Sequence, residues 1–219
     1  MRRWLFGTLA ALVVVVCALA VVYVVPVVKV GTIAVEGAVH ADVAAVQSAT
    51  GVSLGENLMR VDTARAADGV IGVPWVKRAT VSRAFPSTLR VVVEEQEAVA
   101  FVTRGDGTHL INELGQEFVI APAEIGMIEI QDTPEGVDNS ALYGDVLAVV
   151  AALGEDVLGN VARVHAPGRY QISLELLDGR TVYWGSAEQA AAKAAATSIV
   201  LTREGTVFNV SAPDLVTVS

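Results

Sequence analysis

The sequence has a single cysteine, Cys17, among its 219 residues. One thiol can form no disulfide framework within the chain and cannot supply a multi-cysteine metal site. Histidine is almost as scarce, and His40, His109 and His165 lie too far apart to show the spacing of metal ligands. We therefore expect neither a bound metal nor another cofactor.

Basic residues are also in short supply, since 15 Lys and Arg stand against 24 Asp and Glu, for a net charge of −9. Nucleic-acid binding depends on cationic side chains that neutralise phosphates, so no nucleic-acid partner is expected. Aromatic residues make up only 5% of the chain, yet 53% of it is hydrophobic. This content excludes a disordered chain, which requires low hydrophobicity.

The short motifs of the common enzyme classes are absent from the sequence. It contains no phosphate-binding Walker loop, no dinucleotide-binding glycine pattern and no Gly-x-Ser-x-Gly nucleophile motif. Acidic residues such as Asp106 and Asp178 stand beside glycines, where turns commonly place them. We expect a protein that is not an enzyme, although a carboxylate pair formed from distant positions stays open as an alternative.

Hydrophobic residues are concentrated in one long run, residues 4–28, which reads WLFGTLAALVVVVCALAVVYVVPVV. Only Gly7, Thr8 and Pro26 fall outside the hydrophobic set, and the run contains no charge. A helix of this length spans roughly 37 Å, which exceeds the ~30 Å of hydrocarbon in a bilayer. We predict a single transmembrane helix over residues 4–28, preceded by a cytoplasmic tail of residues 1–3.

The charges that flank this run predict its orientation. Arg2 and Arg3 precede it, whereas the part beyond residue 29 holds all 24 acidic and 12 of the 15 basic residues, a formal charge of −12. The positive-inside rule places the N-terminus in the cytoplasm and this acidic part outside the membrane. A signal peptide cleaved near Ala20 is the alternative, but the apolar residues VVYVVPVV that follow favour an uncleaved anchor.

The segment after the apolar run predicts a small α+β unit. Alternation around Ile33 predicts a strand, and Asp42 and Asp62 are each suited to cap a short helix. Residues 76–83 and 88–95 predict two further strands joined by a turn. In the resulting order β-α-α-β-β, two helices can cover one face of a three-stranded sheet.

The rest of the chain predicts many short strands and two helices. A helix is expected over residues 140–153, and a second one starts where Ser186 and Gln189 form a capping-box pattern. Asp178-Gly179 is a strong signal for a tight hairpin turn. The predicted strands lie at 100–103, 109–112, 117–120, 127–130, 170–177, 180–185, 206–211 and 214–219.

Two segments carry the most specific patterns. Residues 74–102, PWVKRATVSRAFPSTLRVVVEEQEAVAFV, contain Pro-Trp-Val, then Ala-x-Val-x-Arg, then an aromatic residue before Pro-Ser-Thr. Residues 177–201, LDGRTVYWGSAEQAAAKAAATSIVL, followed by VFNVSAP, give a strand, a glycine turn, a strand, a lysine-containing helix and a last strand. Both segments resemble the FtsQ/DivIB family of bacterial cell division proteins, and the resemblance covers essentially the whole chain.

The resemblance implies an α+β fold with one N-terminal transmembrane helix. A POTRA domain at residues 29–98 and a mixed α/β C-terminal β domain at residues 99–219 would follow. The implied function is a non-enzymatic divisome scaffold that links early and late division proteins at the septum through its extracytoplasmic domains. The implied partners are FtsB and FtsL at the C-terminal edge strand, and FtsW, FtsI or FtsK near the POTRA domain. The implied location is the cell membrane, with the N-terminus cytoplasmic.

A strand at the edge of a sheet has unpaired N–H and C=O groups to which a partner strand can add. The candidate edge in this sequence is residues 206–219, with a last strand that needs no partner as the alternative.

Trp75 and Phe85 are expected in the POTRA core, and core packing is also open for Trp184. The candidate contact residues are Arg169, Tyr183, Trp184, Val207, Asn209, Leu215, Val216 and Val218.

Two other functions stay open at this point. A membrane-anchored cell-wall hydrolase or transpeptidase would require a nucleophile or a metal constellation that the sequence does not single out. A POTRA-type export or assembly factor would contain the same small β-α-α-β-β unit.

Overall fold

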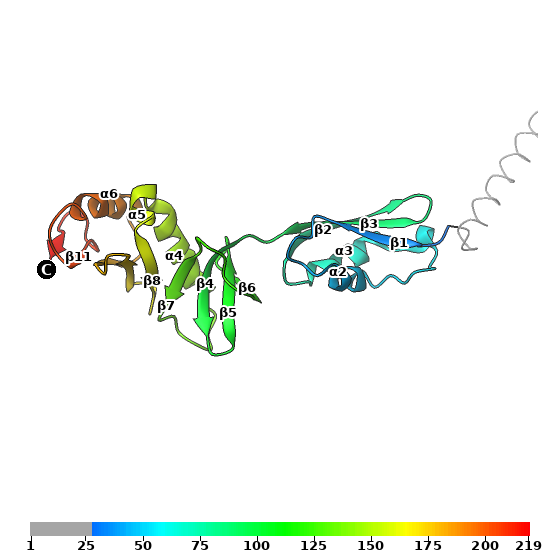
Figure 1. Ribbon diagram of the computed structural model, residues 1–219, viewed down its shortest axis with the longest axis horizontal. Helices are drawn as coiled ribbons and strands as arrows, with labels where there is room; N and C mark the ends of the chain where they lie inside the picture. The colour runs from blue at the N-terminus through cyan, green and yellow to red at the C-terminus, as the bar shows by residue number, and fades with distance from the viewer. Residues whose placement is uncertain (1–27) are drawn as a thin grey trace, which may run out of the picture. The chain divides into compact units, whose positions relative to one another are not determined.

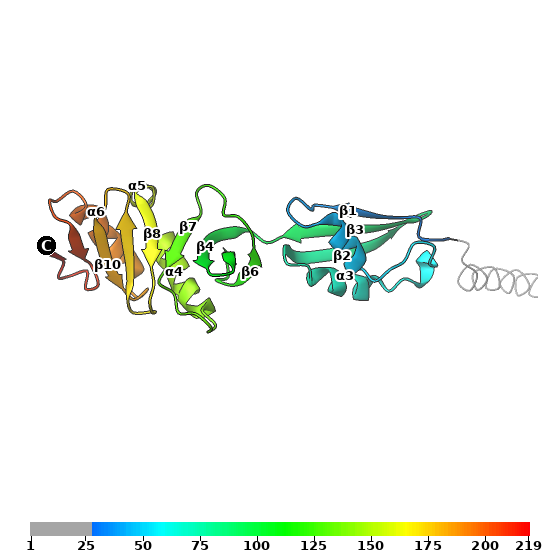
Figure 2. The same cartoon turned by 60° about the horizontal axis from the view of Figure 1, so that its bottom comes forward.

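The computed structural model describes residues 28–219, which fold into two compact units (Figures 1 and 2). The first unit ends at Gln96 and the second spans Glu97–Ser219. The helix predicted over residues 4–28 lies outside the described residues, apart from its last position. Within residues 28–219, no helix is both long enough and apolar enough to cross a membrane.

The first unit has the order β-α-α-β-β that the sequence predicts. Its elements are β1 (Thr32–Glu36), α2 (Val43–Ala49), the 3-10 helix η1 (Leu58–Arg60), α3 (Thr63–Ile71), β2 (Val76–Ala84) and β3 (Thr88–Glu95). The strands form one sheet in the order β1-β3-β2, in which β1 is parallel and β2 antiparallel to β3. Helices α2 and α3 lie together on one face of this sheet (Figure 1).

Both helices of the first unit begin at the predicted aspartates. The side chain of Asp42 accepts a hydrogen bond from the N–H of Ala44, and that of Asp62 accepts from Ala64 and Arg65. Such a cap contributes about 1 kcal/mol. Alternate residues of the strands then meet the helices in a core that includes Val46, Leu58, Val70, Leu89 and Val91.

Arg83, the arginine of the Ala-x-Val-x-Arg pattern, binds two backbone carbonyls of the first unit. Its Nε donates to the carbonyl of Leu58 at 2.9 Å, and its Nη2 donates to the carbonyl of Val61 at 2.5 Å. These two carbonyls belong to η1 and to the residue that follows it. The arginine of β2 therefore fixes the loop that leads into α3.

Glu95, the last residue of β3, fixes the turn between β1 and α2. Its carboxylate accepts hydrogen bonds of 2.8–3.1 Å from the backbone N–H groups of Val39, His40 and Ala41. The ring of His40 lies 2.9 Å from the same carboxylate and stacks on Trp75, with ring centroids 4.4 Å apart. Burial opposes the charge, but these hydrogen bonds lower the pKa of Glu95.

Phe85 departs from the predicted core of the first unit. Trp75 is partly buried and packs against the core, whereas Phe85 is 62% exposed. The prediction for Phe85 is wrong because the residue lies in the turn beyond Ala84 and Thr88, the last paired residues of the β2–β3 hairpin. The side chain therefore lies past the end of the sheet.

The second unit is a mixed α/β fold, as the resemblance implies. Its strands form one sheet in the order β12-β11-β10-β9-β8-β7-β4-β5-β6. The elements are β4 (Ala98–Arg104), β5 (Gly107–Asn112), β6 (Glu117–Ile120), β7 (Ile128–Gln131), α4 (Ser140–Ala152), α5 (Glu155–Leu158), β8 (Val161–His165), β9 (Ile172–Leu176), β10 (Thr181–Gly185), α6 (Ala190–Val200), β11 (Val207–Asn209) and β12 (Thr217–Val218).

The two faces of this sheet differ in character. One face packs on α4 and α6, through buried residues that include Ile130, Val164, Leu174, Val182 and Phe208. Alternation along the strands turns the neighbouring side chains to the other face. There Glu129, Arg163, His165 and Glu175 form a polar, partly exposed surface.

Helix α6 begins later than the capping-box pattern predicts. It starts at Ala190, and Gln189 has φ 54° and makes no side-chain capping bond, so the predicted capping box is wrong. The carbonyl of Ser186 instead accepts a hydrogen bond from Nζ of Lys193 at 2.8 Å. Lys193 is buried, and this burial lowers the pKa of its ammonium group.

Candidate functional site

Strand β12 forms one free edge of the large sheet, and β6 forms the other. β12 is antiparallel to β11, with Val218 opposite Phe208, and Ser219 and Val207 exchange two hydrogen bonds of 3.0 Å. Because hydrogen-bonded and non-hydrogen-bonded pairs alternate in such a ladder, the N–H and C=O of Val218 point away from β11. They form the unpaired edge to which another strand could add.

Three candidate contact residues share the polar face of the sheet next to this edge. Tyr183 of β10 lies opposite Asn209 of β11, and Thr181 lies opposite Val207. Opposite residues point to the same face, and Thr181 and Tyr183 in turn lie opposite Glu175 and Ser173 of β9. Val207 is exposed, whereas Tyr183 and Asn209 are half-buried.

Asn209 also ends β11. Its Oδ1 accepts hydrogen bonds from the backbone N–H of Ser211 at 3.0 Å and from the Ser211 hydroxyl at 2.7 Å. This arrangement is typical of turns in which an Asn side chain replaces a backbone acceptor. Asn209 therefore turns the chain toward β12 as well as lying on the candidate face.

Trp184 is a predicted contact residue that does not reach the surface. It is completely buried in the core beneath the helices, on the face opposite to Tyr183. Because successive side chains of a strand alternate between faces, Tyr183 points to the polar face and the indole of Trp184 points into the core. Val216 lies between these cases, because it is partly buried and packs against the same core.

Two apolar side chains of the edge remain in contact with solvent. Leu215 is 75% exposed and Val218 is 39% exposed. Val218 lies over Gly205, where a Cβ would come within 2.4 Å of its Cγ1 and where φ is 147°. Glycine at 205 thus lets β12 close onto the sheet, and the remaining surface of Val218 stays available at the edge.

Arg169 lies in the loop between β8 and β9. Its Nε and Nη2 donate to the two carboxylate oxygens of Asp145 on α4, at 2.5 and 3.1 Å. These bonds raise the pKa of Arg169. The guanidinium fastens the loop to α4 and is still about half exposed.

Tyr170 is an exposed aromatic residue that is not among the predicted contact residues. Its carbonyl oxygen lies 3.9 Å from the position of a Cβ on Gly185, and the Cβ of Ser211 lies 3.1 Å from that position. The loop of Tyr170 therefore adjoins the ends of β10 and β11. Alternation over residues 170–177 predicts a strand that starts at Tyr170, but the turn signal Pro167-Gly168 just before it favours the observed loop.

His165 lies between two carboxylates on the polar face of the same sheet. Its Nδ1 lies 2.7 Å from Asp132 and its Nε2 lies 2.9 Å from Glu175. Burial alone would lower the pKa of His165, but these two carboxylates outweigh it and raise the pKa. Arg163 stands 3.5 Å from Glu175, so the group of charges is mixed in sign.

The raised pKa of His165 predicts a pH-dependent contribution to stability. A group whose pKa rises on folding stabilises the fold fully below its unfolded pKa, and this contribution is lost as pH rises through the folded pKa. His165→Gln should therefore lower the free energy of unfolding by about 0.5–1 kcal/mol at pH 5.5 and by less at pH 9. Denaturant titrations at both pH values check this, and an equal loss at both would contradict it.

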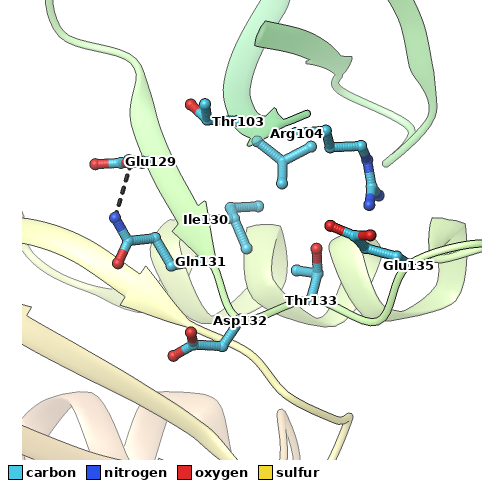
Figure 3. Close-up of a pocket in the computed structure, with 9 residues that line it drawn as sticks. Thr103, Arg104, Glu129, Ile130, Gln131, Asp132, Thr133 and Glu135 are labelled. Atoms are coloured by element: carbon cyan, nitrogen blue, oxygen red, sulfur yellow. Dashed lines mark hydrogen bonds between the residues drawn. The ribbon is translucent and has the colours of Figure 1, made fainter. Parts of the chain in front are cut away.

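A hollow of about 270 Å³ lies beside β4 and β7 (Figure 3). Around it, Gln131 donates to Glu129 at 2.8 Å, and the guanidinium of Arg104 is held by Glu117 and Tyr143. Its lining residues are Val102, Thr103, Arg104, Glu129, Ile130, Gln131, Asp132, Thr133 and Glu135. Over residues 28–219, no three or more His, Cys, Asp or Glu side chains are grouped to hold a metal ion.

Comparison with known families assigns both units. Residues 28–96 match the family described as POTRA domain, FtsQ-type, and residues 100–216 match the family described as Cell division protein FtsQ/DivIB, C-terminal. The second match alone covers more than half of the chain.

Three relatives agree with this assignment. Cell division protein FtsQ of Corynebacterium glutamicum is 41% identical over 201 residues, which cover 90% of each chain. The FtsQ proteins of Mycobacteroides abscessus and Mycolicibacterium smegmatis are 39% and 34% identical over 79% and 90% of this chain. The matched regions cover only 56% and 59% of these two relatives' own lengths.

The two units thus define a protein with a POTRA domain followed by a mixed β domain whose last strand is a free edge. The chain belongs to the FtsQ/DivIB family of cell division proteins. Membership supports a role in the divisome, with other division proteins as partners, and is consistent with a location at the septum.

Proposed function

We propose that this protein is a non-enzymatic scaffold that links early and late division proteins at the septum. In this proposal residues 4–28 anchor it in the cell membrane as a single pass, with residues 1–3 in the cytoplasm. The POTRA domain (29–98) and the C-terminal β domain (99–219) then lie outside the membrane. The observation that carries the proposal is the unpaired edge of β12 with exposed apolar side chains beside it.

The partner proposed for this edge is the FtsB–FtsL pair, one chain of which adds a strand to β12. Outward N–H and C=O groups, such as those of Val218, supply backbone hydrogen bonds that any strand can make. Selectivity comes from side chains, namely Leu215 and Val218 at the edge and Tyr183 and Val207 on the polar face. Tyr170, exposed at the ends of β10 and β11, extends the same surface.

The partners proposed for the POTRA domain are FtsW, FtsI or FtsK. This part rests on the family membership of residues 28–96. The sheet face away from α2 and α3 carries cross-strand ion pairs, Arg78 with Glu94 at 2.7 Å and Arg90 with Glu36 at 3.1 Å. Exposed charges of both signs suit a transient contact in which electrostatic complementarity selects the partner.

Cell biology tests the proposal most broadly. A fluorescently tagged copy should concentrate at midcell, and depletion of the protein should give undivided or filamentous cells. A copy that lacks Asp214–Ser219 should reach the membrane but fail to restore division, because it lacks β12. An even distribution over the membrane, or full rescue by the truncated copy, would contradict the scaffold proposal.

A further inference from the structure

Two large apolar side chains are exposed at one end of the POTRA domain. Leu54 is 67% exposed in the loop before η1, and Phe85 is 62% exposed in the β2–β3 turn. Figures 1 and 2 both show these loops at the end of the domain where the described chain begins. Exposed apolar residues gathered at one place on a domain commonly mark a contact surface.

Backbone hydrogen bonds fasten both loops to the first described residues. The N–H of Gly55 donates to Val30 at 2.8 Å, and the N–H of Leu58 donates to the carbonyl of Val28 at 2.9 Å. On the other side, the N–H of Gly31 donates to the carbonyl of Ser87 at 2.7 Å. Leu54 and Phe85 therefore stay within a few residues of the point where the chain enters the domain.

That entry point follows directly on the long apolar run, which ends at Val28. A helix over residues 4–28 would be roughly 7 Å longer than the hydrocarbon core, so its last residues reach the headgroup layer. Phe85 is two residues from Ser87, and two extended residues span at most about 7 Å. Both exposed side chains are thus within reach of the layer in which aromatic residues of membrane proteins concentrate.

We propose that Leu54 and Phe85 enter the headgroup boundary of the bilayer and hold the POTRA domain in a fixed orientation on the membrane. The proposal rests on the membrane anchor of the proposed function. Burial of apolar surface in the boundary stabilises this contact, and the exposed Lys29 at the entry point can pair with lipid phosphates. The occupant of this surface is therefore lipid, and the β12 edge is left free for protein.

The chain's single cysteine makes a direct test practical. In a Cys17→Ala background, Phe85→Cys and Leu54→Cys are made separately in the full chain, spin-labelled and reconstituted into phosphatidylcholine–phosphatidylglycerol vesicles. Val39→Cys is the matched control, because Val39 is 81% exposed and follows the C-terminal end of β1. The five residues of β1 span about 17 Å, so this end is well separated from the point where the chain enters the domain. Collision with oxygen, which concentrates in lipid, is compared with collision with a water-soluble nickel chelate.

The labels at 54 and 85 should collide more with oxygen than with the chelate, and the label at 39 should show the reverse. Vesicle flotation of each sample separates this inference from the anchor on which it rests. Suppose that the protein floats but the chelate reaches the labels at 54 and 85 as readily as the label at 39. This result would overturn the lipid contact and leave the anchor standing. Protein that does not float would overturn both the anchor and the contact.

Discussion

Val218→Pro should weaken binding of the FtsB–FtsL pair by roughly ten- to a hundredfold. The proline removes an outward N–H of β12, so a partner carbonyl loses its hydrogen bond and is left unsatisfied, at a cost of about 1–3 kcal/mol. The bonds between Ser219 and Val207 do not use this N–H, and edge strands tolerate proline where the N–H faces outward. Titration of the variant with the partner pair measures the change.

The control for this prediction is Val218→Ala, which shortens the side chain but keeps the N–H group. It should lose only the apolar contact of a side chain that is already 39% exposed, and so bind more tightly than the proline variant. An unchanged melting temperature in both variants shows that the fold is intact. Equal affinity of Val218→Pro and the unaltered protein would contradict strand addition at β12.

Glu95→Gln should destabilise the POTRA domain by about 2–3 kcal/mol. The carboxylate accepts from three consecutive backbone N–H groups, and the neutral amide loses the charge and one of the two acceptor oxygens. Since the pKa of Glu95 is lowered in the fold, its stabilisation is full above about pH 4.5 and is lost as pH falls through the folded pKa. Native-state hydrogen exchange of the β1–β3 amides in the whole protein measures this loss.

The neighbouring residue supplies a matched control for this prediction. Glu94 pairs with Arg78 on the exposed face of the same sheet, at 2.7 Å. Glu94→Gln removes the same charge from an exposed pair and should cost less than about 0.5 kcal/mol. If both variants lost the same stability, the turn between β1 and α2 would not depend on the Glu95 carboxylate.

Features with a local cause could be predicted from the sequence. Asp42 and Asp62 cap their helices because a cap bond joins residues two or three positions apart. The turn at Asp178-Gly179 is equally local, although it also includes Leu177, and Gly179 has the φ of 85° that glycine adopts readily. The order β-α-α-β-β follows from these local signals, and the structure confirms it.

Features that depend on tertiary contacts could not be predicted in the same way. Ser186 and Gln189 form no capping box, because α6 begins only at Ala190, and the carbonyl of Ser186 instead accepts from the buried Lys193. Alternation predicts that Tyr183 and Trp184 face opposite sides, but only the packing of α4 and α6 decides which side is buried. The exposed Tyr170 lies near the ends of β10 and β11 because its loop adjoins Gly185 and Ser211, which are distant in sequence.

The strand order is the least local feature and the one on which the candidate site depends. β11 pairs with β10 in parallel, and β12 then folds back antiparallel to β11. A sequence of short strands does not specify which of them ends the sheet, since several orders satisfy the same alternation. The candidate edge at residues 206–219 therefore depended on the family resemblance, and the strand order places β12 there.

Amide hydrogen exchange at Val218 tests the strand-addition account most directly. In the free protein this N–H points away from β11, so it should exchange rapidly, while the N–H of Ser219, bonded to Val207, exchanges more slowly. Addition of the FtsB–FtsL pair should slow exchange at Val218 markedly, because a partner carbonyl then accepts from it. A complex that forms with the exchange rate of Val218 unchanged would contradict the account.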